Sequence, residues 1–182
     1  MKDLIHPRLS SEKKNPVFGG YFYNPTKGSL KLDQVIDEIL AYIESETDNF
    51  YDIIIGCDSS SEKVPNFPVA IVVLKMGEGG RFFLKKISYK NRKFHSWRER
   101  ILEEVLLSCK LALLFKEKLE KRIESKDKNY NYRFCYIHAD IGENGGTKDM
   151  IKEVVGLIRG NGFEPKIKPE AYVASSVADR YA

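Results

Sequence analysis

Two acidic residues stand at points where apolar runs end. Asp58 follows residues 51–57, which include three consecutive isoleucines and are typical of a strand buried on both faces. Asp140 follows a second apolar run, residues 134–139. An aspartate at the end of an interior strand must be paired, bind a metal or take up a proton. If the two strands are parallel neighbours, their ends meet at one sheet edge and the carboxylates lie close together.

Two further acids complete a candidate set of four. Near the C-terminus, Asp179 shares a helical stripe with small residues such as Ala171 and Ser175, which let a helix approach a sheet closely. An acid on that stripe is directed inward. On the long helix predicted over residues 96–125, Glu104 lies nearest the apolar stripe. The pattern does not exclude its neighbours on that helix, Glu99 and Glu103.

Carboxylates that converge repel one another unless a cation neutralises them. Hard oxygen ligands of this kind favour Mg²⁺ or Mn²⁺ over zinc. Two such ions about 4 Å apart can activate a water and stabilise the leaving oxygen of a phosphodiester. The four acids therefore predict a metal-dependent site. The alternative is that they are ordinary helix caps and ion pairs.

His138 lies two residues before Asp140 in the same apolar run. Strand alternation predicts that Phe134, Tyr136, His138 and Asp140 share one face. On that face the imidazole could orient an attacking water or act as a general acid or base. The alternative is a buried histidine bonded to a neighbouring backbone carbonyl.

A basic and aromatic segment precedes the long helix. Its cations can neutralise phosphates while its rings stack on bases or sugars. The alternative is a solubilising strand edge followed by a helix start that Trp97 anchors. Lys168, close to the last acid in sequence, is a further candidate for phosphate contact. The predicted nucleic-acid-binding residues are Lys90, Arg92, Lys93, Trp97 and Lys168.

Composition limits the class of protein. The chain has 182 residues, a net charge of +4 and 42% hydrophobic residues, which fits one globular domain of ordinary size. The mildly basic balance permits a polyanionic partner without requiring one. Three cysteines without close Cys or His pairs suggest neither a disulfide framework nor a zinc site. No apolar run is long enough to cross a bilayer, so we expect a cytoplasmic protein without membrane contact.

The elements that must position the acids follow from periodicity and turn residues. We expect residues 1–28 to form an arm packed on the domain, and residues 29–182 to form a single domain without internal repeats. The predicted class is α/β, with a mixed five-stranded sheet, helices on both faces and an N-terminal helical extension. The predicted helices cover residues 30–46, 96–125 and 148–159, with a last one from Pro169; the strands cover 51–58, 69–74, 81–89, 134–140 and 163–168.

This order of elements and acids, β-β-β-α-β-α-β-α, resembles the ribonuclease H-like superfamily. The stretches Gly56–Ser59, His138–Gly142 and Lys168–Asp179 look more narrowly like its YkuK-type family. The resemblance covers the chain from about residue 20 onward, and the last stretch is its most specific part. It implies that Asp58 is the first-strand aspartate bridging two metals. It likewise implies that Asp140 and Asp179 are the fourth-strand and last-helix acids, with Glu104 as the match for the helix glutamate.

The resemblance implies a Mg²⁺- or Mn²⁺-dependent nuclease that hydrolyses RNA, an RNA–DNA hybrid or structured DNA by a two-metal mechanism. A nucleic-acid-binding module of the same fold with little or no catalysis is the alternative. A nucleotide-handling phosphotransferase is a weaker one, based on glycines near Asp140 that resemble a phosphate loop. The sequence leaves the substrate, the oligomeric state and the pathway open.

Overall fold

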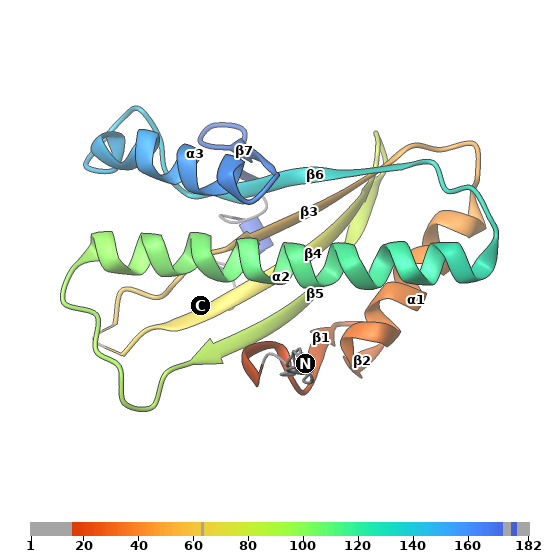
Figure 1. The fold of residues 1–182 in the computed structure, drawn as a ribbon, viewed down its shortest axis with the longest axis horizontal. Helices are drawn as coiled ribbons and strands as arrows, with labels where there is room; N and C mark the ends of the chain where they lie inside the picture. The colour runs from red at the N-terminus through yellow and green to blue at the C-terminus, as the bar shows by residue number, and fades with distance from the viewer. Residues whose placement is uncertain (1–15, 63, 173–175, 178–182) are drawn as a thin grey trace, which may run out of the picture.

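Among the described residues, seven strands form one mixed sheet (Figure 1). The computed structural model describes residues 16–62, 64–172 and 176–177. The strands lie in the order β2-β1-β5-β4-β3-β6-β7. Their bounds are Phe22–Asn24 for β1, Gly28–Leu30 for β2, Tyr51–Cys57 for β3, Asn66–Lys75 for β4, Gly79–Ser88 for β5, Tyr132–Ala139 for β6 and Glu164–Lys166 for β7.

The centre of the sheet follows the prediction. β3, β4 and β5 pair antiparallel as a meander, because short turns join them. β6 pairs parallel with β3, and β7 pairs parallel with β6. After β5, the long helix carries the chain back across the sheet, so that β6 lies beside β3 and parallel to it. The carboxyl ends of β3, β6 and β7 therefore lie at one edge of the sheet.

The predicted count of five strands was too low, because residues 22–30, which cross the predicted boundary between arm and domain, add a hairpin to the sheet. β1 and β2 pair antiparallel, and Tyr23 of β1 lies opposite Leu84 of β5. The Asn24 side chain accepts hydrogen bonds from the backbone nitrogens of Thr26 and Lys27, and Gly28 has a φ of 73°. These strands of three residues are too short for a period-2 pattern to reveal them.

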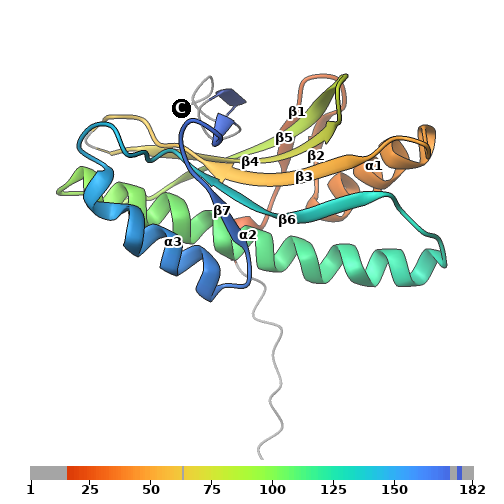
Figure 2. The ribbon, with the colours of Figure 1, turned by 90° about the horizontal axis from the view of Figure 1, so that it is seen from above.

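Three α-helices pack on one face of the sheet. They are α1 (Leu32–Ser45), α2 (Trp97–Lys126) and α3 (Ile151–Gly160), and a 3₁₀ turn, Lys148–Met150, leads into α3. Figure 2 shows α2 and α3 on the same side of the strands, and all three helices share a core cluster with Ile53 and Ile55 of β3. None of the described helices combines the length and the apolarity that a membrane span requires.

The opposite face has a smaller apolar cluster centred on Ile54 and Val72. Val177, in a helical turn at residues 176–177, packs against this cluster. The last predicted helix therefore contacts the second face where it is described, although most of it lies outside the described residues. Its predicted start was wrong: Pro169 lies in a turn over residues 168–170, ahead of the helical residue Tyr172.

A bulge in β6 changes which side chains share a face. Ile53 lies opposite Phe134, whereas Ile54 lies opposite Tyr136, so Cys135 is an extra residue in the ladder. Phe134 consequently points toward α2, where its ring meets that of Phe115 at 5.2 Å. The prediction that Phe134 shares a face with Tyr136 was wrong, because strict alternation does not anticipate an inserted residue.

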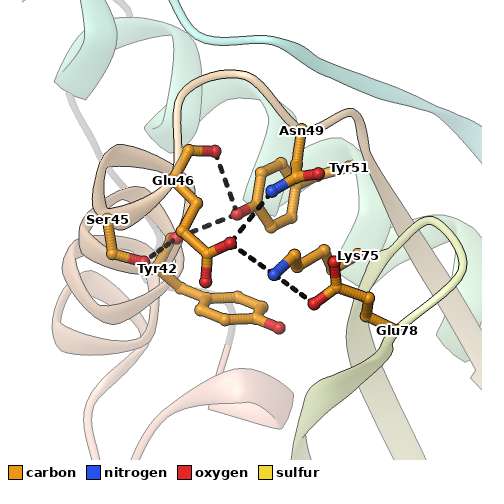
Figure 3. Close-up of polar contacts among 7 residues, drawn as sticks. All are labelled: Tyr42, Ser45, Glu46, Asn49, Tyr51, Lys75 and Glu78. Carbon is orange, nitrogen blue, oxygen red and sulfur yellow. Dashed lines mark hydrogen bonds and ion pairs between the residues drawn. The ribbon is translucent and has the colours of Figure 1, made fainter.

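A polar cluster fastens α1 to the end of the sheet where β3 begins (Figure 3). Lys75, at the end of β4, is only 6% exposed and lies 2.5 Å from a carboxylate oxygen of Glu46 and of Glu78. The Tyr51 hydroxyl donates to the backbone oxygens of Tyr42 and Glu46 at 3.3 Å. This cluster closes one end of the β3–β4 pair and leaves Asp58 at the other.

Candidate metal and nucleic-acid site

Asp58 and Asp140 leave the sheet at the same edge. Cys57 and Ala139, the last residues of β3 and β6, lie opposite each other in the parallel ladder. The two aspartates follow directly and line one pocket of about 400 Å³, which Glu104 of α2 also lines. The structure thus brings three of the four predicted acids together. Asp179, the fourth, lies outside the described residues.

Glu104 is held by the loop that follows β3. Its Oε1 accepts hydrogen bonds from the Ser59 hydroxyl at 2.5 Å and from the Ser59 backbone nitrogen at 3.1 Å. The side chain is buried, and burial raises the pKa of Glu104 to about 8. The charges of Asp58 and Asp140 raise this pKa further, whereas the Ser59 hydrogen bonds lower it.

The neighbouring acids of α2 have other partners. Glu103 accepts hydrogen bonds from the Tyr89 hydroxyl at 2.5 Å and from Arg92 Nη1 at 2.6 Å. Glu99 accepts from the backbone nitrogen of His95 in the segment that precedes the helix. Of the three candidates, Glu104 is the one that lines the pocket with the two aspartates.

Asp140 has one satisfied and one unsatisfied oxygen. Its Oδ2 lies 2.9 Å from Lys168 Nζ. Its Oδ1 is buried and is the one fully buried side-chain polar atom in the described residues without a hydrogen-bond partner. A buried carboxylate oxygen without a partner is unfavourable unless a further donor or cation reaches it.

The residues of this pocket fit a hard divalent cation. They offer carboxylate oxygens, the ligands that Mg²⁺ and Mn²⁺ prefer, and one of these oxygens lacks a partner. Burial, together with the charges of Asp58 and Asp140, raises the pKa of Glu104, which a cation in the pocket would offset. In their present positions, however, no three His, Cys, Asp or Glu side chains of the described part form a ready metal-binding group.

His138 lies on the face of β6 opposite to the helices, because Ile137 and Ala139 on either side of it point into the helix-covered core. Its ring meets that of Tyr172 edge-on at 5.1 Å. Burial, with the nearby charge of Lys166, lowers the pKa of His138 to about 4. The imidazole is therefore neutral at physiological pH, and its catalytic role stays a prediction.

The predicted nucleic-acid-binding residues divide into two groups. Trp97, which is 39% exposed, and Lys168 line the pocket of the acids. Lys90, Arg92 and Lys93 are exposed on the segment that leads into α2. Arg92 also has an internal role, because it pairs with Glu103 and its guanidinium lies 4.6 Å from the centre of the Phe94 ring. Nucleic-acid binding by these residues stays a prediction.

Sequence reasoning missed two residues that shape the pocket. Ser59 fixes the Glu104 carboxyl, and Arg100 Nη1 donates to the backbone oxygen of Ser60 at 3.0 Å. The serine run after Asp58 was a sequence signal for Ser59, because hydroxyl groups near an acid at a strand end can donate hydrogen bonds to a carboxylate. Nothing in the pattern of α2 distinguishes Arg100 from other surface arginines.

Comparisons with known proteins identify the family of the chain. A family model described as ribonuclease H-like matches residues 34–182. A protein of Bacillus subtilis (strain 168) named "Uncharacterized protein YkuK" is 30% identical over 168 residues, which span 88% of this chain and 95% of the relative. No solved structure matches the chain significantly. The chain therefore belongs to the ribonuclease H-like family and, within it, to the YkuK type.

Proposed function

We propose that this protein is a Mg²⁺- or Mn²⁺-dependent nuclease that hydrolyses phosphodiester bonds of RNA, an RNA–DNA hybrid or structured DNA. One observation carries the proposal: Asp58, Glu104 and Asp140 line a single pocket in which Asp140 Oδ1 is buried without a partner. The nuclease-type fold of the family supports the same reading.

Asp58, Glu104 and Asp140 would hold the metal, with Asp179 as the expected fourth ligand. A divalent cation supplies two things to such a site: an activated water and stabilisation of the leaving oxygen. The chain's own residues orient the groups. Ser59 directs the Glu104 carboxyl, and Arg100 fixes the loop that carries Ser59 and Ser60. Their role is to keep the ligands in place before substrate arrives.

The residues at the rim of the pocket contact the substrate. Trp97 offers an exposed ring on which a base can stack, and the Arg98 guanidinium lies 4.9 Å from the centre of that ring. Lys90 and Lys93 add exposed positive charge on the adjoining segment. These residues bind phosphates and bases without selecting a sequence.

The test is a panel of labelled RNA, RNA–DNA hybrid and branched DNA substrates in Mg²⁺ and in Mn²⁺. We expect cleavage of at least one substrate, loss of cleavage in EDTA, and a loss of at least about 100-fold in Asp58→Asn. Asp48→Asn is the matched control, because Asp48 is exposed near the opposite end of the sheet. Equal cleavage by wild type and Asp58→Asn would overturn the proposed mechanism.

A second candidate is a nucleic-acid-binding module with little catalysis. Two observations favour it: Lys168 already neutralises Asp140, and the described acids do not form a ready metal-binding group. Titration with Mn²⁺ separates the two functions. Nucleic-acid binding that is the same with and without Mn²⁺, together with no Mn²⁺ bound by the protein alone, would support the module over the nuclease.

A further inference from the structure

The backbone around Lys168 is built to bring this lysine to Asp140. The Lys168 backbone nitrogen donates to the backbone oxygen of Ile141 at 2.8 Å, so the segment after β7 lies along the segment after β6. A Cβ at Gly142 would lie 3.0 Å from Lys168 Cβ, so a larger residue there would crowd the lysine. The position of Lys168 next to Asp140 thus depends on backbone contacts between the segment after β6 and the segment after β7, and not on a chance surface contact.

The lysine side chain itself is open to solvent. It is 54% exposed, whereas Asp140 is 21% exposed. An ion pair with such exposure is weak, because water competes for both partners. The flexible four-carbon stem of a lysine lets its ammonium change partners without a change in the backbone.

Lys168 also stands between two pockets. It lines the pocket of the three acids, and it lines a neighbouring pocket of about 590 Å³ between the segment after β6 and the turn after β7. Asn144 is likewise shared by both pockets. A substrate that extends from the acids into the larger pocket would pass this lysine.

We propose that Lys168 is a built-in counter-cation that a divalent metal displaces from Asp140, and that the released ammonium then contacts a substrate phosphate. The inference rests on the proposed function. Without metal, Lys168 offsets the repulsion among the acids at Asp140 Oδ2. With metal, the same carboxylate is neutralised by the ion, and the ammonium becomes available to the substrate. Metal binding and substrate binding are thereby coupled through one lysine.

The first experiment measures Mn²⁺ binding to the full chain by isothermal titration calorimetry, without substrate. The variants are Lys168→Gln and, as a matched control, Lys166→Gln. Lys166 lines the larger pocket but pairs with Glu170 at 2.6 Å. Removal of a competing cation should tighten Mn²⁺ binding to Lys168→Gln by about three- to fivefold. Lys166→Gln loses the same charge and should change the affinity by less than about twofold.

The second experiment measures binding of an unmodified single-stranded DNA oligonucleotide, which lies outside the proposed substrate classes. In Mn²⁺, Lys168→Gln should weaken binding several-fold relative to wild type. In EDTA the two proteins should bind alike, because the wild-type ammonium remains with Asp140. This dependence on metal is a readout that a purely structural role for Lys168 would not produce.

The outcomes separate the inference from the proposed function. If wild type binds no Mn²⁺, both fail. If wild type binds Mn²⁺ and Lys168→Gln binds it equally or more weakly, the exchange is overturned while the metal site stands. An equal loss of oligonucleotide affinity in Mn²⁺ and in EDTA would also overturn it, since Lys168 would then contact substrate without release by metal.

Discussion

At the scale of single residues, Glu104 is the group whose charge the pocket accommodates least easily. It is buried, it faces two aspartates, and its pKa is raised from 4.5 to about 8. In the metal-free protein the neutral carboxyl is therefore the favoured form near pH 7. A bound cation reverses this preference, because it stabilises the carboxylate. If the pocket binds metal as proposed, Glu104 links its protonation state to its metal content.

This link predicts how the stability of the metal-free protein depends on pH. A carboxyl whose pKa is higher in the folded state stabilises the fold at low pH, and this stability is lost as pH rises through about 8. Urea unfolding in EDTA at pH 6.5, 7.5 and 8.5 should therefore show a falling free energy of unfolding. The opposite effect of His138 lies between its folded pKa of about 4 and the unfolded value near 6.5, so it is nearly complete by pH 7.5.

Glu104→Gln is the informative variant for this measurement. The amide keeps the shape of the side chain but does not titrate, so the decline in the free energy of unfolding between pH 6.5 and 7.5 should largely disappear. The buried thiols of Cys57 and Cys109, whose pKa values are raised in the folded state, still contribute a decline toward pH 8.5 in both proteins. A decline as steep as that of wild type would show that another group causes it.

Ser59 provides a second prediction at this scale. Its hydroxyl and backbone nitrogen both donate to Glu104 Oε1, so Ser59→Ala removes one of two hydrogen bonds that orient the carboxyl. We expect nuclease activity to fall by about tenfold, which corresponds to one hydrogen bond of about 1.4 kcal/mol. Ser59→Thr, which keeps the hydroxyl, should restore most of it.

Ser61→Ala is the matched control, because Ser61 lies in the same loop and is exposed. The cleavage rate of Ser61→Ala, measured in parallel, should equal that of wild type. A similar loss in both variants would indicate a general effect on the loop and would remove the assigned role of Ser59.

At the scale of elements, α2 places Glu104 because its apolar side is fixed against the sheet. Phe115 is fully buried on that side, and its ring meets Phe134 of β6 at 5.2 Å. Phe115→Ala should destabilise the fold by about 3 to 5 kcal/mol, from lost burial and the remaining cavity. Leu113→Ala, at an exposed position of the same helix, should cost less than about 0.5 kcal/mol.

Chemical denaturation of the two variants tests this difference. It also tests whether the packing of Phe115, near the middle of α2, holds this helix on the sheet. A loss in Phe115→Ala no larger than that in Leu113→Ala would contradict the packing of this helix on β6.

The limits of sequence reasoning are also clearest at this scale. The long helix, the β3–β5 meander and the two strand-end aspartates were predictable, because periodicity and turn residues determine them. Which of Glu99, Glu103 and Glu104 enters the pocket was not, since all three lie within two turns of α2. Their partners decide it, and those partners come from distant segments: Ser59 for Glu104, and Tyr89 with Arg92 for Glu103.

Two features of the sheet could not be read from local pattern. The bulge at Cys135 depends on how β6 registers against β3, a long-range property. The β1–β2 hairpin depends on contact with β5 rather than on its own three-residue strands. The apolar pattern of a segment reports what it buries, but it does not report its register against a partner.

At the scale of the whole molecule, charge is distributed unevenly around the site. The net charge is only +4, and three acids meet in the pocket itself. A polyanion therefore needs local positive charge beside the acids in order to approach them. The segment that leads into α2 carries Lys90 and Lys93, which come shortly before Trp97 in the sequence. Trp97 lies at the rim of the pocket. The position of these cations, more than the total charge, should govern binding.

Replacement of both lysines by alanine tests the effect of position. If each contacts one phosphate, loss of both should weaken oligonucleotide binding and reduce the slope of log K against log salt by about 1 to 2. The matched control is Lys110→Ala with Lys116→Ala, two exposed positions on α2. It lowers the net charge by the same amount at positions outside the segment that leads into α2. Fluorescence anisotropy across a salt series measures both slopes. Equal changes in the two double variants would mean that total charge attracts the nucleic acid and that the segment before α2 is not its binding surface.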